Sequence, residues 1–289
     1  MLFNILFYIF IVDLISKMLY KYKYILFQFF SHFVNRGDFM KSFVFLNRKG
    51  GTGKTSVSVT CAIELARKGF KTVLVDCDPQ GNSSSWLAKD FQYELSDVLT
   101  GKVTVENCLV QTHFENLFLL PTFAINGGLQ AFASSTRNYY AFEDSVFPAL
   151  KDFDYLIFDT SPAFGDFEKG IANCADTIVP VLKLDQFSAD GFQTLIENLI
   201  TTTKEIRCKD LLEKISFVIL NQQDKRMKFQ SLFAENFMKN FDDTQFFTIP
   251  TDTSFVKAQI LKNAISDKSI TARKETTDAI GAIIKEMTK

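Results

Sequence analysis

A glycine-rich stretch that also carries basic and hydroxyl side chains, "NRKGGTGKTS", occupies residues 47–56. Its second half, Gly53 followed by Lys54 and Thr55, matches the end of the phosphate-loop pattern G-x-x-x-x-G-K-[ST]. In such a loop, glycines let the backbone curl so that its N–H groups point at phosphates. Lys54 would neutralise the β- and γ-phosphates of a nucleotide, and the Thr55 hydroxyl would bind Mg²⁺. The stretch therefore predicts a phosphate site.

The first half of the same loop departs from that pattern. Arg48 stands where the pattern has its first glycine, and the glycines come later, at Gly50 and Gly51. An additional lysine, Lys49, directly precedes them. The loop is therefore either an ordinary phosphate loop whose pattern has been partly lost or a different loop that uses a second cation.

Aspartates follow two apolar runs of strand length. Asp76 and Asp78 end the run 71–78, and Asp159 lies near the end of the run 155–160. Carboxylates at the carboxyl edge of parallel strands lie where ligands bind in α/β folds. A helix N-cap or a turn would explain one of the first two aspartates, but not both together with the Pro-Gln-Gly that follows.

The elements that must position these residues alternate between apolar strands and helical patterns. This rhythm predicts an α/β fold with a mostly parallel, twisted sheet and helices on both faces. The expected strands are 42–47, 71–78, 117–121, 155–160, 177–182 and 214–221. The expected helices are 55–69, 139–151, 188–203, 228–240 and 271–288, with short helices and loops in 79–116.

Composition favours a packed, non-disulfide protein. Of the 289 residues, 47% are hydrophobic and 22% are charged, which argues against disorder. The formal net charge of -1 gives no support for nucleic-acid binding. The five cysteines have no C-x-x-C spacing and the two histidines have no metal-ligand spacing, so reduced core thiols are expected.

The segment 1–39 is apolar and aromatic but is interrupted by Asp13 and Lys17. It has neither the uninterrupted apolar length of a membrane-spanning helix nor the charge order of a signal peptide. We interpret it as a wrongly extended start or a segment outside the domain, and an interfacial anchor is the alternative. A single domain is expected over residues 40–289.

The octapeptide "KGGTGKTS" resembles the deviant Walker A box, K-G-G-x-G-K-[ST], of the ParA/MinD superfamily of P-loop ATPases. The resemblance implies ATP and Mg²⁺ as cofactors, and it explains Arg48, because the family does not use the first glycine of the ordinary pattern. It also implies that Lys49 crosses to the nucleotide of a partner subunit in an ATP-sandwich homodimer, as an arginine finger does. The implied nucleotide-binding loop comprises Gly50, Gly51, Thr52, Gly53, Lys54, Thr55 and Ser56.

Two further stretches are similar to boxes of this family. "VLVDCDPQGNSS" resembles the ParA box, which implies that Asp78 orients the attacking water and that Asp76 supports the metal shell. "YLIFDTSPAFG" resembles the Walker B strand and the following D-T-P-P, which implies that Asp159 holds Mg²⁺ through water. Ser161 replaces the first proline there, and this segment is the expected γ-phosphate switch.

Two stretches resemble the region around the nucleotide base. "ILNQQD" places Asn221 where the family has an asparagine that contacts the base. "TIPTDTSFVKA" resembles the family's I-P-R-N stretch and implies a base contact by Pro250. Thr251 and Asp252 replace Arg and Asn there, which argues against a DNA-contacting arginine at this position.

The resemblance implies a DNA-partition ATPase that is cytoplasmic and nucleoid-associated. Its expected partners are a second copy of the chain, non-specific DNA and a ParB-like protein. A membrane partner is not expected, since the C-terminus lacks a basic, aromatic targeting helix. The alternatives are a MinD-like positioning ATPase anchored by residues 1–39, or a metabolic ATP-dependent enzyme. The candidate DNA-binding residues are Lys225, Arg226, Lys228, Lys257, Lys262, Arg273 and Lys274.

Overall fold

The computed structural model describes residues 40–183 and 188–289, except for residues 225, 228, 229, 231, 233, 236, 237 and 240–243 and the side chains of 188–190. Residues Met40–Lys289 form a compact unit. The predictions about 1–39 lie outside the described residues and stay predictions. No helix in the described ranges has both the length and the apolar character needed to cross a membrane.

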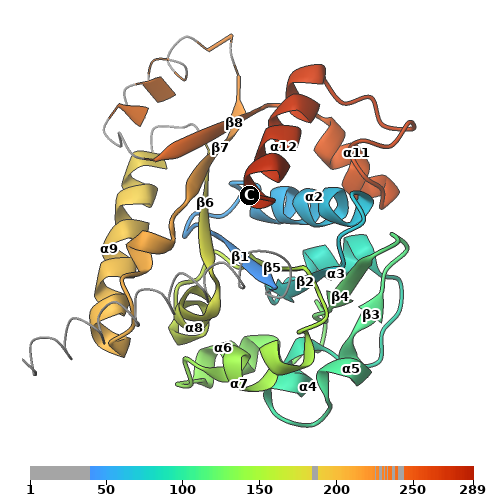
Figure 1. Ribbon diagram of the computed structural model, residues 1–289, viewed down its shortest axis with the longest axis vertical. Helices are drawn as coiled ribbons and strands as arrows, with labels where there is room; N and C mark the ends of the chain where they lie inside the picture. Colours follow the sequence, from blue (N-terminus) through green and yellow to red (C-terminus); the bar gives the residue numbers. More distant parts are fainter. Residues whose placement is uncertain are drawn as a thin grey trace, which may run out of the picture. The chain divides into compact units, whose positions relative to one another are not determined.

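An eight-stranded sheet forms the centre of the unit (Figure 1), in the order β3-β4-β2-β5-β1-β6-β7-β8. All its neighbouring strands are parallel except β3 and β4, which are antiparallel. The strands are β1 (Lys41–Leu46), β2 (Thr72–Cys77), β3 (Val110–Gln111), β4 (Leu117–Leu120), β5 (Tyr155–Thr160), β6 (Thr177–Lys183), β7 (Phe217–Gln223) and β8 (Gln245–Pro250). The predicted mostly parallel sheet is confirmed.

The central strands of the sheet are buried on both faces because their sequences are largely apolar. In β1, Phe43 and Phe45 belong to one hydrophobic cluster, whereas Val44 and Leu46 belong to the other. Successive side chains of a strand point to opposite faces, so a continuous apolar run supplies two cores. Helices must therefore cover both faces.

Helices α2, α11 and α12 supply one of these cores, whereas α8 and α9 supply the other (Figure 1). The longer helices are α2 (Lys54–Arg67), α8 (Asp166–Cys174), α9 (Ser188–Ile206), α11 (Ser254–Leu261) and α12 (Lys274–Met287). The shorter ones are α3 (Asn82–Leu87), α4 (Leu95–Leu99), α5 (Val105–Cys108), α6 (Leu129–Ser135), α7 (Ala141–Ser145), η1 (Phe147–Ala149) and η2 (Leu211–Lys214).

The C-terminal helix α12 is amphipathic and packs inward. Ile280, Ile283, Ile284 and Met287 are buried in the core that α12 shares with α2. These residues recur at the three- and four-residue spacing of one helix face. The apolar face of α12 therefore stabilises the fold.

The observed elements differ from the predicted ones in several places. The predicted helix 139–151 is wrong, because α7 ends at Ser145 and a separate short 3₁₀ helix that contains Pro148 follows it. The strands β3 and β8 and the helices α6, α8 and α11 were not predicted. The predicted helix 228–240 falls largely on residues outside those described.

Candidate nucleotide site

The glycine-rich loop connects the end of β1 to the start of α2. Gly51 has a φ of 73° and Gly53 has a φ of 89°, values in the left-handed region that glycine adopts without steric cost. The helix begins at Lys54, so its first N–H groups and the positive end of its dipole face the loop. This arrangement is suited to binding an anion such as phosphate.

Asn221, at the end of β7, holds the loop from the side. Its amide nitrogen Nδ2 donates a hydrogen bond to the Thr52 carbonyl oxygen at 2.8 Å. A Cβ atom built on Gly53 would lie only 2.2 Å from that nitrogen. Gly53 is therefore required both by its backbone conformation and by its neighbour.

Lys54 is buried under the loop. Its Nζ atom donates to the carbonyl oxygens of Asn47 at 3.0 Å and Lys49 at 3.4 Å. Burial lowers the pKa of Lys54, while the carboxylates of Asp159 and Asp78 oppose that change. The lysine thus lies in a desolvated position where interaction with phosphate is strong.

A pocket of about 270 Å³ opens in front of the loop. The loop forms one part of its lining, and Asp78, Thr160 and Pro162 join it from the ends of β2 and β5. The lining residues are Gly51, Thr52, Gly53, Lys54, Thr55, Ser56, Asp78, Asn82, Thr160, Pro162 and Gln259. The structure therefore brings most of the predicted phosphate-binding loop together with one of the predicted carboxylates.

Asp159 and Thr55 fit a magnesium site. The Oδ1 atom of Asp159 is buried and has no hydrogen-bond partner among the described residues, whereas Oδ2 accepts a hydrogen bond from Ser83 Oγ at 2.5 Å. Burial raises the pKa of Asp159, and hydrogen bonds from Ser83 and Thr55 oppose this rise. The Oδ1 atom of Asp159 and the Thr55 hydroxyl are therefore two oxygen donors suited to Mg²⁺.

No cluster of three or more His, Cys, Asp or Glu side chains suited to a metal occurs in the described part of the chain. This is compatible with Mg²⁺, which usually takes one or two protein oxygens and completes its shell with water and phosphate.

Asp76 lies opposite Asp159 on the neighbouring strand, in the interior of the fold. Its Oδ2 atom accepts hydrogen bonds from the backbone N–H of Ser84 at 2.8 Å and from the Ser84 hydroxyl at 2.6 Å. Burial and the charge of Asp159 raise the pKa of Asp76, although the hydrogen bonds from Ser84 and Asp78 oppose this. Asp76 thus fixes the start of α3 and lies beside Asp159, one of the two candidate metal ligands.

Asp78 lies at the edge of the pocket. Its backbone N–H donates to Asp76 Oδ1 at 3.2 Å, and its own Oδ1 accepts from the backbone N–H of Gln80 at 2.9 Å. The side chain is therefore oriented by the turn that follows β2.

Lys49 is half-buried and is not among the residues that line the pocket of its own chain. Its backbone N–H donates to Asn47 Oδ1 at 2.9 Å, and Asn47 Nδ2 donates to the Val181 carbonyl oxygen at 2.7 Å. The backbone at this lysine is thus anchored to β6.

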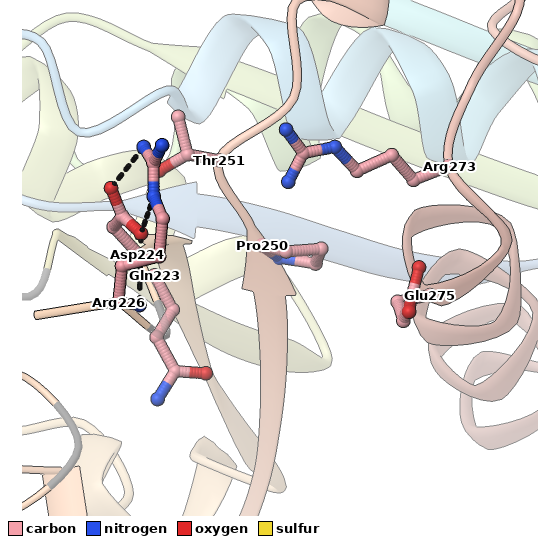
Figure 2. A pocket seen from close by; sticks show the side chains of 7 residues that line it. All are labelled: Gln223, Asp224, Arg226, Pro250, Thr251, Arg273 and Glu275. Atoms are coloured by element: carbon pink, nitrogen blue, oxygen red, sulfur yellow. Dashed lines mark hydrogen bonds and ion pairs between the residues drawn. The ribbon is translucent and has the colours of Figure 1, made fainter. Parts of the chain in front are cut away.

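A second pocket, of about 240 Å³, lies at the end of β7 and β8 (Figure 2). Pro250 lines it, together with Gln223, Asp224, Arg226, Thr251, Arg273 and Glu275. Figure 2 shows the Arg226 guanidinium paired with Asp224, with Arg226 Nη2 2.7 Å from Asp224 Oδ2. Hydrogen bonds from Arg226 lower the pKa of Asp224 to about 2.

Asp252 connects the end of β8 to α12. Its carboxylate accepts hydrogen bonds from the backbone N–H groups of Ser254 and Arg273, each at 2.9 Å, and from Thr276 Oγ1 at 2.7 Å. Burial alone would raise the pKa of Asp252, but these hydrogen bonds lower it. The residue that replaces the family's asparagine thus has a structural role here.

The candidate DNA-binding residues have different surroundings. Lys257, Lys262, Arg273 and Lys274 are exposed, whereas the charge of Arg226 is already paired. Lys225 and Lys228 lie outside the described residues.

Several site residues were not identified from the sequence. Asn82 and Ser83 lie inside the quoted ParA-like box, so their proximity to the site could have been expected. Gln259 lies on α11, more than 200 residues after the loop, and no local pattern indicated that it lines the phosphate pocket.

Comparisons with known proteins agree with this geometry. The profile of a family described as AAA domain matches residues 40–214. The chromosome-partitioning ATPase Soj of Treponema pallidum (strain Nichols) is 29% identical over 212 residues, covering 72% of this chain and 82% of that protein.

Two solved structures show the same fold. McdA from Cyanothece in its apo form has a TM-score of 0.75 at 18% identity and covers 86% of this chain and 100% of its own. Cobyrinic acid a,c-diamide synthase from Mycobacterium smegmatis, with bound ATP analog and magnesium, has a TM-score of 0.68 at 21% identity and covers 86% and 94%. With the family match and the phosphate pocket, the chain belongs to the AAA domain family and is a ParA/Soj-like P-loop ATPase.

Proposed function

We propose that this ATPase is a DNA-partition protein that binds ATP and Mg²⁺, forms an ATP-sandwich homodimer and binds DNA without sequence preference. A ParB-like partner stimulates its hydrolysis of ATP. The phosphate pocket carries this proposal, because it combines the glycine loop, Lys54 and Asp78 in one place. The sequence similarity to a chromosome-partitioning ATPase supports the cellular role.

Lys54 and the loop N–H groups hold the β- and γ-phosphates, and Thr55 and Asp159 hold the magnesium ion. The magnesium ion, when bound, neutralises charge on the phosphate oxygens. The Oδ1 atom of Asp159, which no described residue hydrogen-bonds, supports this assignment. So does the magnesium bound with an ATP analog in the structurally similar synthase.

Asp78 orients the attacking water at the mouth of the pocket. Its position beside the loop and its fixed turn support this role. Asp76 supports the metal site indirectly, because it is buried beside Asp159 on the neighbouring strand and is hydrogen-bonded to Ser84.

The nucleotide base binds beside Pro250, in the pocket at the end of β7 and β8. Asn221 was predicted to contact the base, and its amide holds Thr52 in the structure. We retain the base contact as a proposal for the nucleotide-bound state.

Lys49 acts on the nucleotide of the partner subunit. Its absence from the lining of its own pocket and the anchoring of its backbone by Asn47 support an action outside its own chain. A second cation on the phosphates would stabilise transition-state charge and make dimerisation depend on a bound triphosphate.

The exposed lysines and arginines of α11 and of the region around the start of α12 form the candidate DNA surface, in a cytoplasmic, nucleoid-associated protein. A membrane role for α12 is disfavoured, because Ile280, Ile283 and Met287 on its apolar face are buried. A membrane role of residues 1–39 is tested by flotation of liposomes with the full chain and with a chain that starts at Met40.

Sizing chromatography with ATP, with ADP and without nucleotide tests the proposal. ATP should double the apparent mass, and ADP should not. Lys54→Ala should abolish nucleotide binding, whereas Lys49→Ala should bind ATP as a monomer. A Lys49→Ala protein that dimerises with ATP at normal affinity would contradict the assigned role of this lysine.

Retention on non-specific DNA distinguishes a DNA-partition protein from a metabolic ATP-dependent enzyme. Retention should require ATP and should weaken steeply as salt rises, because each phosphate contact releases counterions. ATP turnover that a small molecule stimulates and DNA leaves unchanged would instead indicate a metabolic enzyme.

A further inference from the structure

A buried carboxylate outside the predicted site holds the turn that forms one wall of the phosphate pocket. Glu168 lies in the first turn of α8 and is 3% exposed. Its Oε1 accepts a hydrogen bond from Ser161 Oγ at 3.0 Å, and its Oε2 accepts one from the Gly165 N–H at 2.9 Å. One side chain therefore binds both ends of the segment 161–165.

The Ser161 hydroxyl has a second interaction within that segment. It accepts a hydrogen bond from the Ala163 N–H at 3.1 Å while it donates to Glu168. Ser161 itself is 7% exposed. The hydroxyl therefore fixes the backbone on both sides of Pro162.

Pro162 is the residue of the 161–165 segment that reaches the phosphate pocket. It lines the phosphate pocket, and its Cγ would lie 3.8 Å from a Cβ atom placed on Gly50. Thr160, just before the segment, also lines the pocket and donates from Oγ1 to the Phe45 carbonyl oxygen at 2.6 Å. The wall is thus attached to β1 at one end and to α8 at the other.

We infer that Glu168 is a positioning residue that acts through Ser161 and holds the 161–165 turn ready for the terminal phosphate of ATP. The inference rests on the proposed binding of ATP in this pocket. The loop N–H groups and Lys54 hold the β-phosphate, which ATP and ADP share, as well as the γ-phosphate, whereas the wall contributes only where that third phosphate is present.

The proline in the related D-T-P-P motif has no hydroxyl, so the Ser161–Glu168 contact depends on this chain's own sequence. Loss of either partner leaves buried polar groups unsatisfied, and the turn must move to solvate them. Pro162 then adopts several positions. A ligand that requires the original position binds more weakly, because only a fraction of the molecules hold it.

The experiment compares the dissociation constants of ADP and of the non-hydrolysable β,γ-imido analogue of ATP, both with Mg²⁺. Ser161→Ala and Glu168→Leu should weaken binding of the analogue about tenfold, as expected for one lost hydrogen bond to a charged group. Binding of ADP should stay within about twofold of wild type, because the wall does not contact the phosphates that ADP retains.

Two further variants separate positioning from stability. Glu168→Gln keeps an acceptor for Gly165 and an amide that can donate to Ser161, so it should restore most of the analogue affinity. Lys169→Ala removes the neighbouring ion pairs of α8 with Asp166 and Glu205, which are 3.4 Å and 2.6 Å long. It should leave the ratio of the two constants unchanged.

The outcomes are distinct. An unchanged affinity for the analogue in Ser161→Ala overturns the inference, even where Glu168→Leu fails to fold. An equal loss of ADP and analogue binding in Ser161→Ala also overturns it, since the effect is then general. A wild-type protein that binds neither nucleotide refutes the proposed function itself.

Discussion

The close approach of Asn221 to Gly53 gives a quantitative prediction for the variant Gly53→Ala. The new Cβ would lie 2.2 Å from Asn221 Nδ2, so Asn221 must leave and lose its hydrogen bond to Thr52. The displaced bond and the unsatisfied buried carbonyl cost about 1–2 kcal/mol. The left-handed φ of 89° costs an alanine about 1–2 kcal/mol more. We expect a total destabilisation of roughly 3 kcal/mol.

Gly69→Ala is a matched control for the backbone contribution. Gly69 has a φ of 93°, and a Cβ placed on it would meet no described atom within 4 Å, so its substitution should cost only about 1–2 kcal/mol. The free energy of unfolding of each variant is measured by urea denaturation without nucleotide, with the slope m checked for constancy.

The double variant Gly53→Ala with Asn221→Ala tests the contact directly. Asn221→Ala alone should cost about 1–2 kcal/mol, because the Thr52 carbonyl loses its donor. In the double variant the hydrogen bond from Asn221 to Thr52 can be lost only once. Its destabilisation should therefore be smaller than the sum of the two single variants by about 1–2 kcal/mol. Additive effects, or equal costs for Gly53→Ala and Gly69→Ala, would refute the reasoning.

Three further predictions concern single side chains. Asp252→Ala should lower the free energy of unfolding at pH 7 by about 2 kcal/mol through the lost hydrogen bonds. Because the folded pKa of Asp252 is lowered, the difference from wild type should persist above the ordinary pKa of about 4 and shrink as pH falls below it, which urea denaturation at several pH values measures. Thr55→Ala should reduce the gain in ATP affinity on addition of Mg²⁺ by about tenfold, whereas Thr55→Ser should retain it in the same titration. Lys214 Nζ donates to the carbonyl oxygens of Asn173 at 2.5 Å and Ala175 at 2.8 Å, at the C-terminal end of α8. Lys214→Met should therefore lower the urea midpoint by the equivalent of about 1–2 kcal/mol, and the exposed Lys209→Met should not.

Local sequence was enough to predict the phosphate loop and the strands that carry the site. The positive φ of Gly51 and Gly53 follows from glycines placed between a strand and a helix, and both were named in advance. Strands β1, β2 and β5 were predicted within one residue at each end, because their apolar runs are continuous and short. Asp76, Asp78 and Asp159 were expected at strand ends for the same reason.

The strand β8 and the segment 139–151 lack such continuous patterns. In β8 most residues are only partly buried, since the strand lies at the edge of the sheet, and its sequence shows no clear period. The helical pattern of 139–151 continues past the point where Pro148 ends it.

The sequence by itself determined which residues could bind phosphate and metal, because glycine conformation, lysine charge and carboxylate chemistry are local properties. Only the tertiary structure decided which of them meet. The order β2-β5-β1-β6-β7 places Asp76 against Asp159 and brings Asn221 to Thr52 across a sequence separation of 169 residues. Contacts of such separation depend on strand order and packing, which no local spacing encodes. The hydrogen bond between Ser161 and Glu168 likewise forms only because the folded turn between them brings the two side chains together.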